Sequence, residues 1–193
     1  MSTATATELV STNPATGEAI GSVPVTPVEG IGEVFERSHA AQSPWARLNL
    51  DERIEMLKRA IPVLDSRAEQ IGALVTTEMG KTKAEGMGEV RYGINGLAGK
   101  LDEIAIALSP ETINDGSTKS TLYHDPFGVC VAITPWNFPF LMPLQIIVPA
   151  LAAGNTVVMK PSEMVPFVGQ ALADAFNEVL PAGVLQIVHG DDE

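Results

Sequence analysis

Residues 129–163 read VCVAITPWNFPFLMPLQIIVPALAAGNTVVMKPSE, and this run carries the clearest structural signal in the chain. Short continuous apolar stretches open and close it, Val129–Ile133 and Thr156–Met159, as expected for strands buried on both faces of a parallel sheet. A helix-like segment over about 141–153 lies between them and ends at Gly154. The run therefore predicts strand, helix and strand, the repeating unit of a parallel α/β sheet.

The same alternation continues towards the end of the chain. A second helix-like segment covers about 166–179, and a third apolar run spans Val184–Val188. We therefore predict an α/β fold whose C-terminal third is βαβαβ, the first half of a doubly wound, Rossmann-like parallel sheet. Because the chain stops at Asp191-Asp192-Glu193, soon after the third strand, we expect that sheet to be incomplete.

Residues 30–108 are predicted to be helical, because apolar residues recur there every three or four positions. Caps and helix breakers predict where these helices begin and end: an N-cap at Asp51, a break at Pro62, a stop at Gly80, and capping boxes at Ser66–Glu69 and Thr82–Glu85. Glycines interrupt the last helix, and we expect them to allow close packing at positions 86, 88, 93, 96 and 99.

Two other segments are predicted to be extended. The first 25 residues carry turn signals such as Asn13-Pro14 and Thr16-Gly17, which indicate a partly stranded lead-in. Asn114-Asp115-Gly116 is predicted to be a turn, and Ser120–Tyr123 a short strand rich in β-branched and aromatic residues.

Composition excludes several classes of protein. The 193 residues include 24 acidic and 12 basic side chains, and a net charge of −12 argues against nucleic acid or an anionic membrane as partner. The longest apolar stretch, 138–154, is too short and too rich in proline to span a membrane. A lone cysteine allows no internal disulfide, and residues 1–8 resemble no secretory signal, so we expect a cytoplasmic protein. Three scattered histidines, expected at the surface or in turns, predict no metal site: His39, His124 and His189.

The loop Thr134–Pro139 follows the first strand of the predicted sheet. Ligands of parallel α/β sheets bind at the carboxyl ends of the strands. Asn137 offers an amide donor there between two stiffening prolines, as an oxyanion hole requires. The alternative is an ordinary turn asparagine between two prolines, and the spacing alone favours that alternative.

Lys160 and Glu163 directly follow the second strand. An ammonium group can donate to sugar hydroxyls, and a carboxylate can accept from them, as an acidic residue does for the adenosine ribose in dinucleotide folds. A glutamate also repels a 2′-phosphate, which favours NAD over NADP. The alternative is a solvated charged loop.

Two other motifs are discounted. Gly80-Lys81-Thr82 resembles the end of a phosphate-binding loop, but Val75 stands where that motif needs a glycine. Cys130 lies within an apolar strand run, so we interpret it as a buried small hydrophobe rather than a nucleophile.

The chain resembles the NAD(P)-dependent aldehyde dehydrogenase superfamily over essentially its whole length, and its semialdehyde dehydrogenases in particular. The segments that carry the resemblance are NPATGE (13–18), WAR (45–47), EMGK (78–81), PFGV (126–129), ITPWNFP (133–139), PALAAGNTVVMKPSE (149–163), LPAGV (180–184) and Gly190. The resemblance implies oxidation of an aldehyde to a carboxylic acid, with a cysteine nucleophile, hydride transfer to NAD, or alternatively NADP, and a glutamate-activated water.

Carried over by position, Asn137 resembles the side-chain donor of the oxyanion hole, the one catalytic residue expected here. The residues expected to bind the cofactor are Ile133, Thr134, Pro135, Trp136, Lys160, Ser162 and Glu163. The resemblance also divides the chain into an extended lead-in (1–25), the helical part of the cofactor domain (26–112), a strand extension similar to the family's oligomerisation segment (113–125) and the first half of the NAD-binding sheet (126–193).

The resemblance places the family's phosphate-binding Gly-Ser-Thr segment, catalytic base and nucleophilic cysteine beyond residue 193. We therefore expect the N-terminal portion of such an enzyme, from a truncated gene, a split gene or an incomplete sequence, inactive by itself. The alternative is a non-catalytic interaction or regulatory fragment, which pairs with a full-length or complementary chain through the exposed edge of its unpaired third strand. Homo-oligomers are a further expectation.

Overall fold

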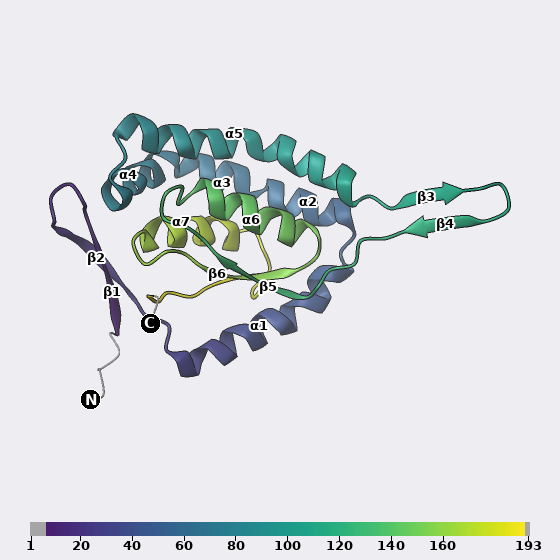
Figure 1. The fold of residues 1–193 in the computed structure, drawn as a ribbon, viewed down its shortest axis with the longest axis horizontal. Helices are drawn as coiled ribbons and strands as arrows, with labels where there is room; N and C mark the ends of the chain where they lie inside the picture. Colours follow the sequence, from purple (N-terminus) through teal and green to yellow (C-terminus); the bar gives the residue numbers. More distant parts are fainter. Residues whose placement is uncertain (1–6, 192–193) are drawn as a thin grey trace.

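The computed structural model describes residues 7–191; the predictions for residues 1–6 and 192–193 lie outside them. Figure 1 shows helices gathered around a small sheet, with two hairpins at the periphery. The helices are α1 (Val28–Arg47), α2 (Leu50–Lys58), α3 (Ala60–Ser66), α4 (Ala68–Met79), α5 (Lys83–Leu108), α6 (Leu141–Ala152) and α7 (Pro166–Asn177). The strands are β1 (Glu8–Thr12), β2 (Ala19–Pro24), β3 (Glu111–Asn114), β4 (Lys119–Leu122), β5 (Val129–Ile133), β6 (Thr156–Lys160) and β7 (Leu185–Ile187).

The parallel sheet confirms the predicted βαβαβ order. Among residues 7–191, its strands lie in the order β5-β6-β7, joined by α6 and α7. One face of the sheet packs on α6 and α7, with the other helices of the main cluster behind them, and α1 lies along the opposite face. The hydroxyl of Thr156 in β6 donates to the carbonyl of Ser38 in α1 at 3.0 Å, which fixes α1 over the middle strand.

Of the three parallel strands within residues 7–191, only the middle one, β6, is buried on both faces. β6 fits the prediction, but Val131 and Ile133 in β5 are 54% and 72% exposed, so that prediction was wrong for β5. The reason is that α1 covers β6 and leaves one face of β5 open. Cys130 points to the other face of β5 and is half-buried against the apolar core, rather than fully buried.

Local capping explains where the helices begin and end. Thr82 and Glu85 form the predicted capping box of α5, and Gly80 ends α4 with a φ of 84°. The predicted cap at Asp51 was wrong, because Asn49 accepts from the backbone N–H of Glu52 at 2.9 Å instead. The box predicted at Ser66 was also wrong: its hydroxyl donates back to the carbonyl of Val63, and α4 begins without it.

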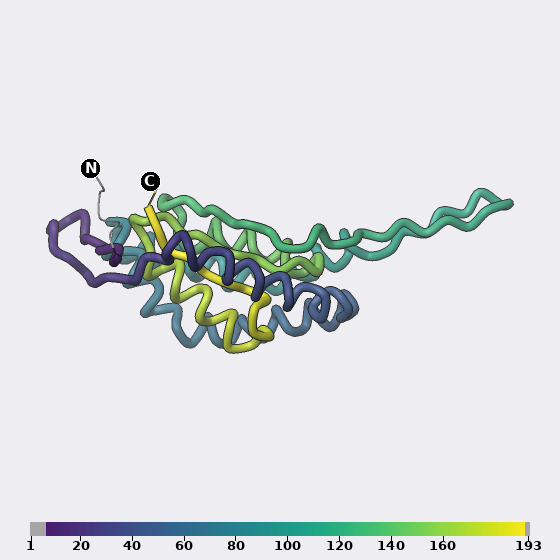
Figure 2. The backbone as a smooth tube through the Cα atoms, turned by 90° about the horizontal axis from the view of Figure 1, so that it is seen from below, coloured from purple at the N-terminus to yellow at the C-terminus, as the bar shows by residue number. Residues whose placement is uncertain are grey.

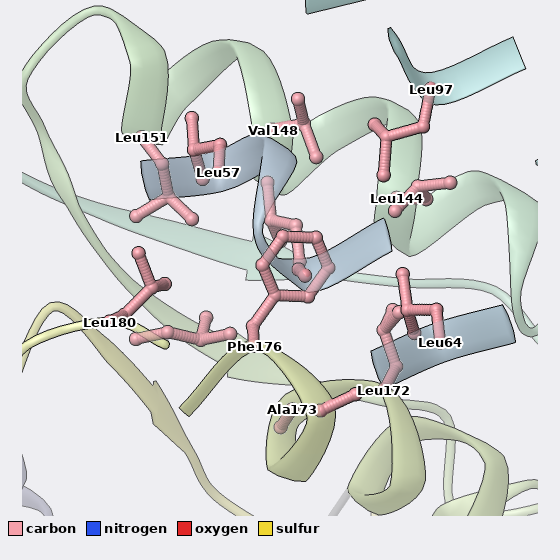
Figure 3. Close-up of a cluster of buried hydrophobic side chains, with 14 of the residues drawn as sticks. Leu57, Leu64, Leu97, Leu144, Val148, Leu151, Leu172, Ala173, Phe176 and Leu180 are labelled. Carbon is pink, nitrogen blue, oxygen red and sulfur yellow. The ribbon is translucent and has the colours of Figure 1, made fainter. Parts of the chain in front are cut away.

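The apolar core lies between the sheet and the helices (Figure 3). Phe176 of α7 is fully buried in the labelled cluster, among leucines from α2, α3, α6 and α7. Two of the predicted packing glycines serve this core: a Cβ at Gly93 would lie 2.9 Å from the Phe140 ring, and one at Gly86 2.8 Å from the carbonyl of Gly72. A Cβ at position 88, 96 or 99 would meet nothing within 4 Å, so those glycines are not needed for packing.

Two antiparallel hairpins lie outside this core. β1 pairs with β2, which gives the predicted lead-in its stranded character. β3 pairs with β4 across the predicted turn, where Gly116 has a φ of 90°. Figure 2 shows this second hairpin projecting from the body of the molecule, and the side chains of both its strands are exposed. The sequence predicted β4 and missed β3.

Candidate functional site

The carboxyl ends of β5 and β6 lie side by side. Ile133 pairs with Lys160 in register, and the backbone N–H of Thr134 donates to the carbonyl of Lys160 at 3.0 Å. The ladder thus continues one residue beyond β5, and the loops that begin at Thr134 and Pro161 leave the sheet together. The structure brings the two groups of residues predicted to bind the cofactor to one end of the sheet: Ile133–Trp136, and Lys160 with Ser162 and Glu163.

The loop after β6 orients its carboxylate. The hydroxyl of Ser162 donates to Glu163 Oε2 at 3.1 Å and accepts from the backbone N–H of Met164 at 3.3 Å. Pro161 is buried against Gly169 of α7, where a Cβ would approach the proline's Cβ to 2.5 Å. Lys160 and Glu163 lie beside this packed support and are only partly buried.

His189 lies just beyond the third strand and is buried, so its expected place at the surface or in a turn was wrong. Its Nε2 lies 2.8 Å from the Gln170 side-chain oxygen, while Nδ1 has no hydrogen-bond partner among residues 7–191. Burial, and secondarily the positive charge of Lys160, lower the pKa of His189. Both effects favour the neutral form of the ring.

The loop after β5 holds Asn137 at the surface. Trp136, Asn137 and Phe138 are exposed, whereas Pro139 and Phe140 are buried where α6 begins. Thr134 is also buried, and its hydroxyl has no partner within the described part of the chain. The amide of Asn137 is thus accessible but not in the dry setting that the sequence interpretation assumed.

Buried carboxylates from the helical region reach both crossover helices. Glu78 of α4 accepts from the backbone N–H groups of Phe167 and Val168, at 3.0 and 2.8 Å, and from the Ser11 hydroxyl. Burial raises the pKa of Glu78, although these hydrogen bonds oppose the shift. Glu89 of α5 likewise accepts hydrogen bonds from two backbone N–H groups at the start of α6. Sequence reasoning missed both residues, because local capping rules do not reach partners 50 to 90 residues apart.

An apolar groove of about 510 Å³ lies between α5 and α6. It begins at Leu141, four residues after Asn137, and its lining includes Tyr92, Leu144 and Val148 with the polar Gln145. The two helices approach closely at Gly93, where a Cβ would lie 2.9 Å from the Phe140 ring and 3.2 Å from the Leu144 side chain. Lys160 and Glu163 do not line this groove.

Residues 7–191 contain neither a cluster of metal ligands nor a membrane-spanning helix. No group of three or more His, Cys, Asp or Glu side chains there could hold a metal ion. None of the helices in that range is long and apolar enough to cross a membrane.

Comparison with known proteins decides the family. The protein-family model for the aldehyde dehydrogenase family matches this sequence over residues 1–193. The chain belongs to the aldehyde dehydrogenase family. Its relatives include a succinate-semialdehyde dehydrogenase of Paenarthrobacter nicotinovorans, 40% identical over 80% of this chain and 35% of its own length. A malonate-semialdehyde dehydrogenase of Bacillus thuringiensis is 35% identical over 98% of this chain and 39% of its own length.

Solved structures of the family share the fold. An aldehyde dehydrogenase from Brucella melitensis biovar abortus superimposes with a TM-score of 0.89 at 36% identity, over 99% of this chain and 40% of that one. An NADP-dependent glyceraldehyde-3-phosphate dehydrogenase of Bacillus halodurans, solved with NADP, superimposes with a TM-score of 0.88 at 30% identity. The match covers 95% of this chain and 40% of that one. An NAD-dependent benzaldehyde dehydrogenase of Corynebacterium glutamicum superimposes with a TM-score of 0.86 at 27% identity. The match covers 96% of this chain and 41% of that one. This chain therefore spans about 35–41% of the length of these family members.

Proposed function

We propose that this chain is the cofactor-binding portion of an NAD-dependent aldehyde dehydrogenase, with NADP as the alternative cofactor. The observation that carries the proposal is the hydrogen bond from Thr134 to Lys160, which continues the ladder past the strand ends. Two loops with chemistry suited to a dinucleotide and to an aldehyde leave the sheet at that point. Ligands of doubly wound folds bind at such an edge.

The residues after β6 fit the ribose of a dinucleotide. The Lys160 ammonium can only donate hydrogen bonds and the Glu163 carboxylate can only accept them, so together they match a pair of sugar hydroxyls. Ser162 already holds one oxygen of Glu163, which reduces the ordering that binding requires. Lys160, Ser162 and Glu163 would hold the adenosine end, and the backbone of Ile133–Trp136 would line the path towards the nicotinamide. NAD, when bound, supplies the hydride acceptor.

Asn137 is the residue that we assign to the reaction itself. Its side-chain amide would donate a hydrogen bond to the aldehyde oxygen as negative charge develops there, and would turn the carbonyl carbon towards an incoming nucleophile. The groove between α5 and α6 begins near this loop and would take the carbon chain of the aldehyde. The names of two relatives support a semialdehyde as the substrate class.

Binding of the dinucleotide tests the assignment of the ribose site. In a titration followed by isothermal calorimetry, NAD should bind the chain weakly, and Lys160→Met should raise the dissociation constant about tenfold, because a charged hydrogen-bond donor is lost. NADP should bind more weakly than NAD, and Glu163→Gln should narrow that difference by removing the repulsion of the 2′-phosphate.

Exposed charges on the β3–β4 hairpin provide the controls. Lys119→Met and Glu111→Gln remove the same groups where both side chains are exposed, and they should leave NAD binding unchanged. A wild-type chain that binds no NAD, or a loss as large in the hairpin variants, would contradict the assignment.

Turnover by the chain alone tests whether it is a complete catalyst. We expect no NADH to form with succinate semialdehyde and NAD, because Cys130 lies half-buried in β5 with its side chain towards the apolar core. NADH formation above a buffer control that disappears in Asn137→Ala would overturn this expectation.

The open face of β5 favours a second candidate function, in which this chain binds another polypeptide. Val131 and Ile133 present apolar surface on a strand whose outer edge has no neighbour among the described residues. A full-length or complementary chain that pairs there would bury both side chains. Sedimentation velocity of the purified chain, alone and mixed with a full-length relative, distinguishes a self-contained monomer from an assembling fragment.

A further inference from the structure

We propose that Lys81 and Glu89 are positioning residues for Asn137, an ion pair from the α4–α5 region that fixes the loop after β5. The inference rests on the proposed function for the role of Asn137. The pair itself is defined by geometry: Lys81 Nζ lies 2.6 Å from Glu89 Oε2. The two side chains are 14% and 2% exposed, so solvent screens this contact far less than a surface ion pair.

Glu89 holds the start of α6. Its other oxygen, Oε1, accepts hydrogen bonds from the backbone N–H groups of Phe140 and Leu141, each at 3.0 Å. The N-cap residue of α6 is Phe140, whose side chain cannot accept a hydrogen bond. The carboxylate of α5 therefore satisfies amides that the α6 sequence leaves unpaired, and its charge is favourable at a helix N-terminus.

Lys81 adds a second hold on the same loop. Its ammonium nitrogen lies 4.0 Å from the centroid of the Phe138 ring, within the range of a cation–π interaction. Phe138 is the residue directly after Asn137. The ion pair thus contacts the chain one and three residues beyond the amide, through the Phe138 ring and the Phe140 N–H group.

The position of Lys81 is itself fixed by the turn between α4 and α5. Gly80 before it ends α4 in the left-handed region, and Thr82 after it opens α5 with a capping box. The ammonium group is therefore carried by a short segment held at both ends. This gives a structural role to the Gly80-Lys81-Thr82 motif, which the sequence discounts as a phosphate-binding loop.

A hydrogen-bond donor for an oxyanion must be held in place before the reaction. The continued ladder at Thr134 fixes the beginning of the loop, and Lys81 with Glu89 fix its end. Glu78 provides the internal comparison, because it caps α7 through two amides as Glu89 caps α6, but its third contact is the Ser11 hydroxyl instead of an ammonium. The lysine is the feature that distinguishes the Asn137 loop.

NMR of the isotope-labelled chain tests the pair without cofactor or substrate. In Lys81→Met we expect the side-chain amide signals of Asn137 and the indole signal of Trp136 to shift or broaden, and hydrogen exchange at the Phe140 amide to speed up about tenfold. Lys81→Arg, which keeps the charge and the stacking, should restore the wild-type signals. Glu78→Gln is the matched control. It should speed up hydrogen exchange at the Phe167 and Val168 amides and leave the side-chain amide signals of Asn137 unchanged.

The proposal is overturned if the Asn137 signals of folded Lys81→Met coincide with those of the wild type, or if Glu78→Gln moves them as far. Should Lys81→Met fail to fold, Glu89→Gln applies the same test through the other partner. Because no ligand takes part, failure of NAD binding would count against the proposed function alone, and unchanged Asn137 signals would count against the positioning pair alone.

Discussion

Gly169→Ala should destabilise the protein by about 1–3 kcal/mol and weaken NAD binding about tenfold, because it overpacks the support of the ribose loop. The new Cβ would lie 2.5 Å from Cβ and 2.7 Å from Cγ of Pro161, closer than real side chains approach. Pro161 is a rigid buried ring between Lys160 and Ser162, so the loop must move as the helix N-terminus is pushed away. Urea denaturation and the NAD titration measure the two effects.

Gly88→Ala is the control for the helical change itself. A Cβ at Gly88 in α5 meets nothing within 4 Å, so this substitution should stabilise the protein by about 0.5–1 kcal/mol, as alanine does in an open helical position. The two variants are therefore expected to change stability in opposite directions. If both substitutions changed the free energy of unfolding in the same direction, or each in the direction expected of the other, Gly169 would not be required for packing.

Phe176→Ala should cost about 3–5 kcal/mol of unfolding free energy, the largest stability effect that we expect from a single truncation. The Phe176 ring is fully buried where α7 meets α2, α3 and α6 (Figure 3), and its removal leaves a cavity bounded by several elements that cannot all collapse into it. Since domains are stable by only about 5–15 kcal/mol, the urea midpoint should fall sharply.

Phe127→Ala removes the same side chain from a fully exposed position, and its free energy of unfolding should change by less than about 0.5 kcal/mol. A comparable loss at both positions would mean that the described core does not dominate stability.

Much of this fold was predictable, because its signals are local. Three apolar runs predicted β5, β6 and β7, and a capping box and a left-handed glycine marked the boundary between α4 and α5. The errors share a cause: Ser66 had a suitable partner in sequence but bonded to a nearer carbonyl, and Asn49 was a better cap than Asp51. Where several polar residues compete for one role, spacing does not rank them.

The candidate site was predictable only in part. Strand ends and loop residues could be placed, because parallel strands bring their carboxyl ends together. The supports of those loops could not be predicted, since Glu89 meets α6 about 50 residues further along the chain and Glu78 meets α7 about 90 residues further. Burial of His189 is likewise a tertiary property, set by the crossing of the lead-in near Thr26 over the end of β7.

Glu78 and Lys81 lie only three residues apart, yet they reach the beginnings of two different crossover helices, α7 directly and α6 through Glu89. The short corner of the backbone at residues 78–81 therefore helps to set the distance between the loop assigned to the ribose and the loop assigned to the aldehyde. A displacement of that corner would move both loops together, so the proposed adenosine site and Asn137 would keep their spacing.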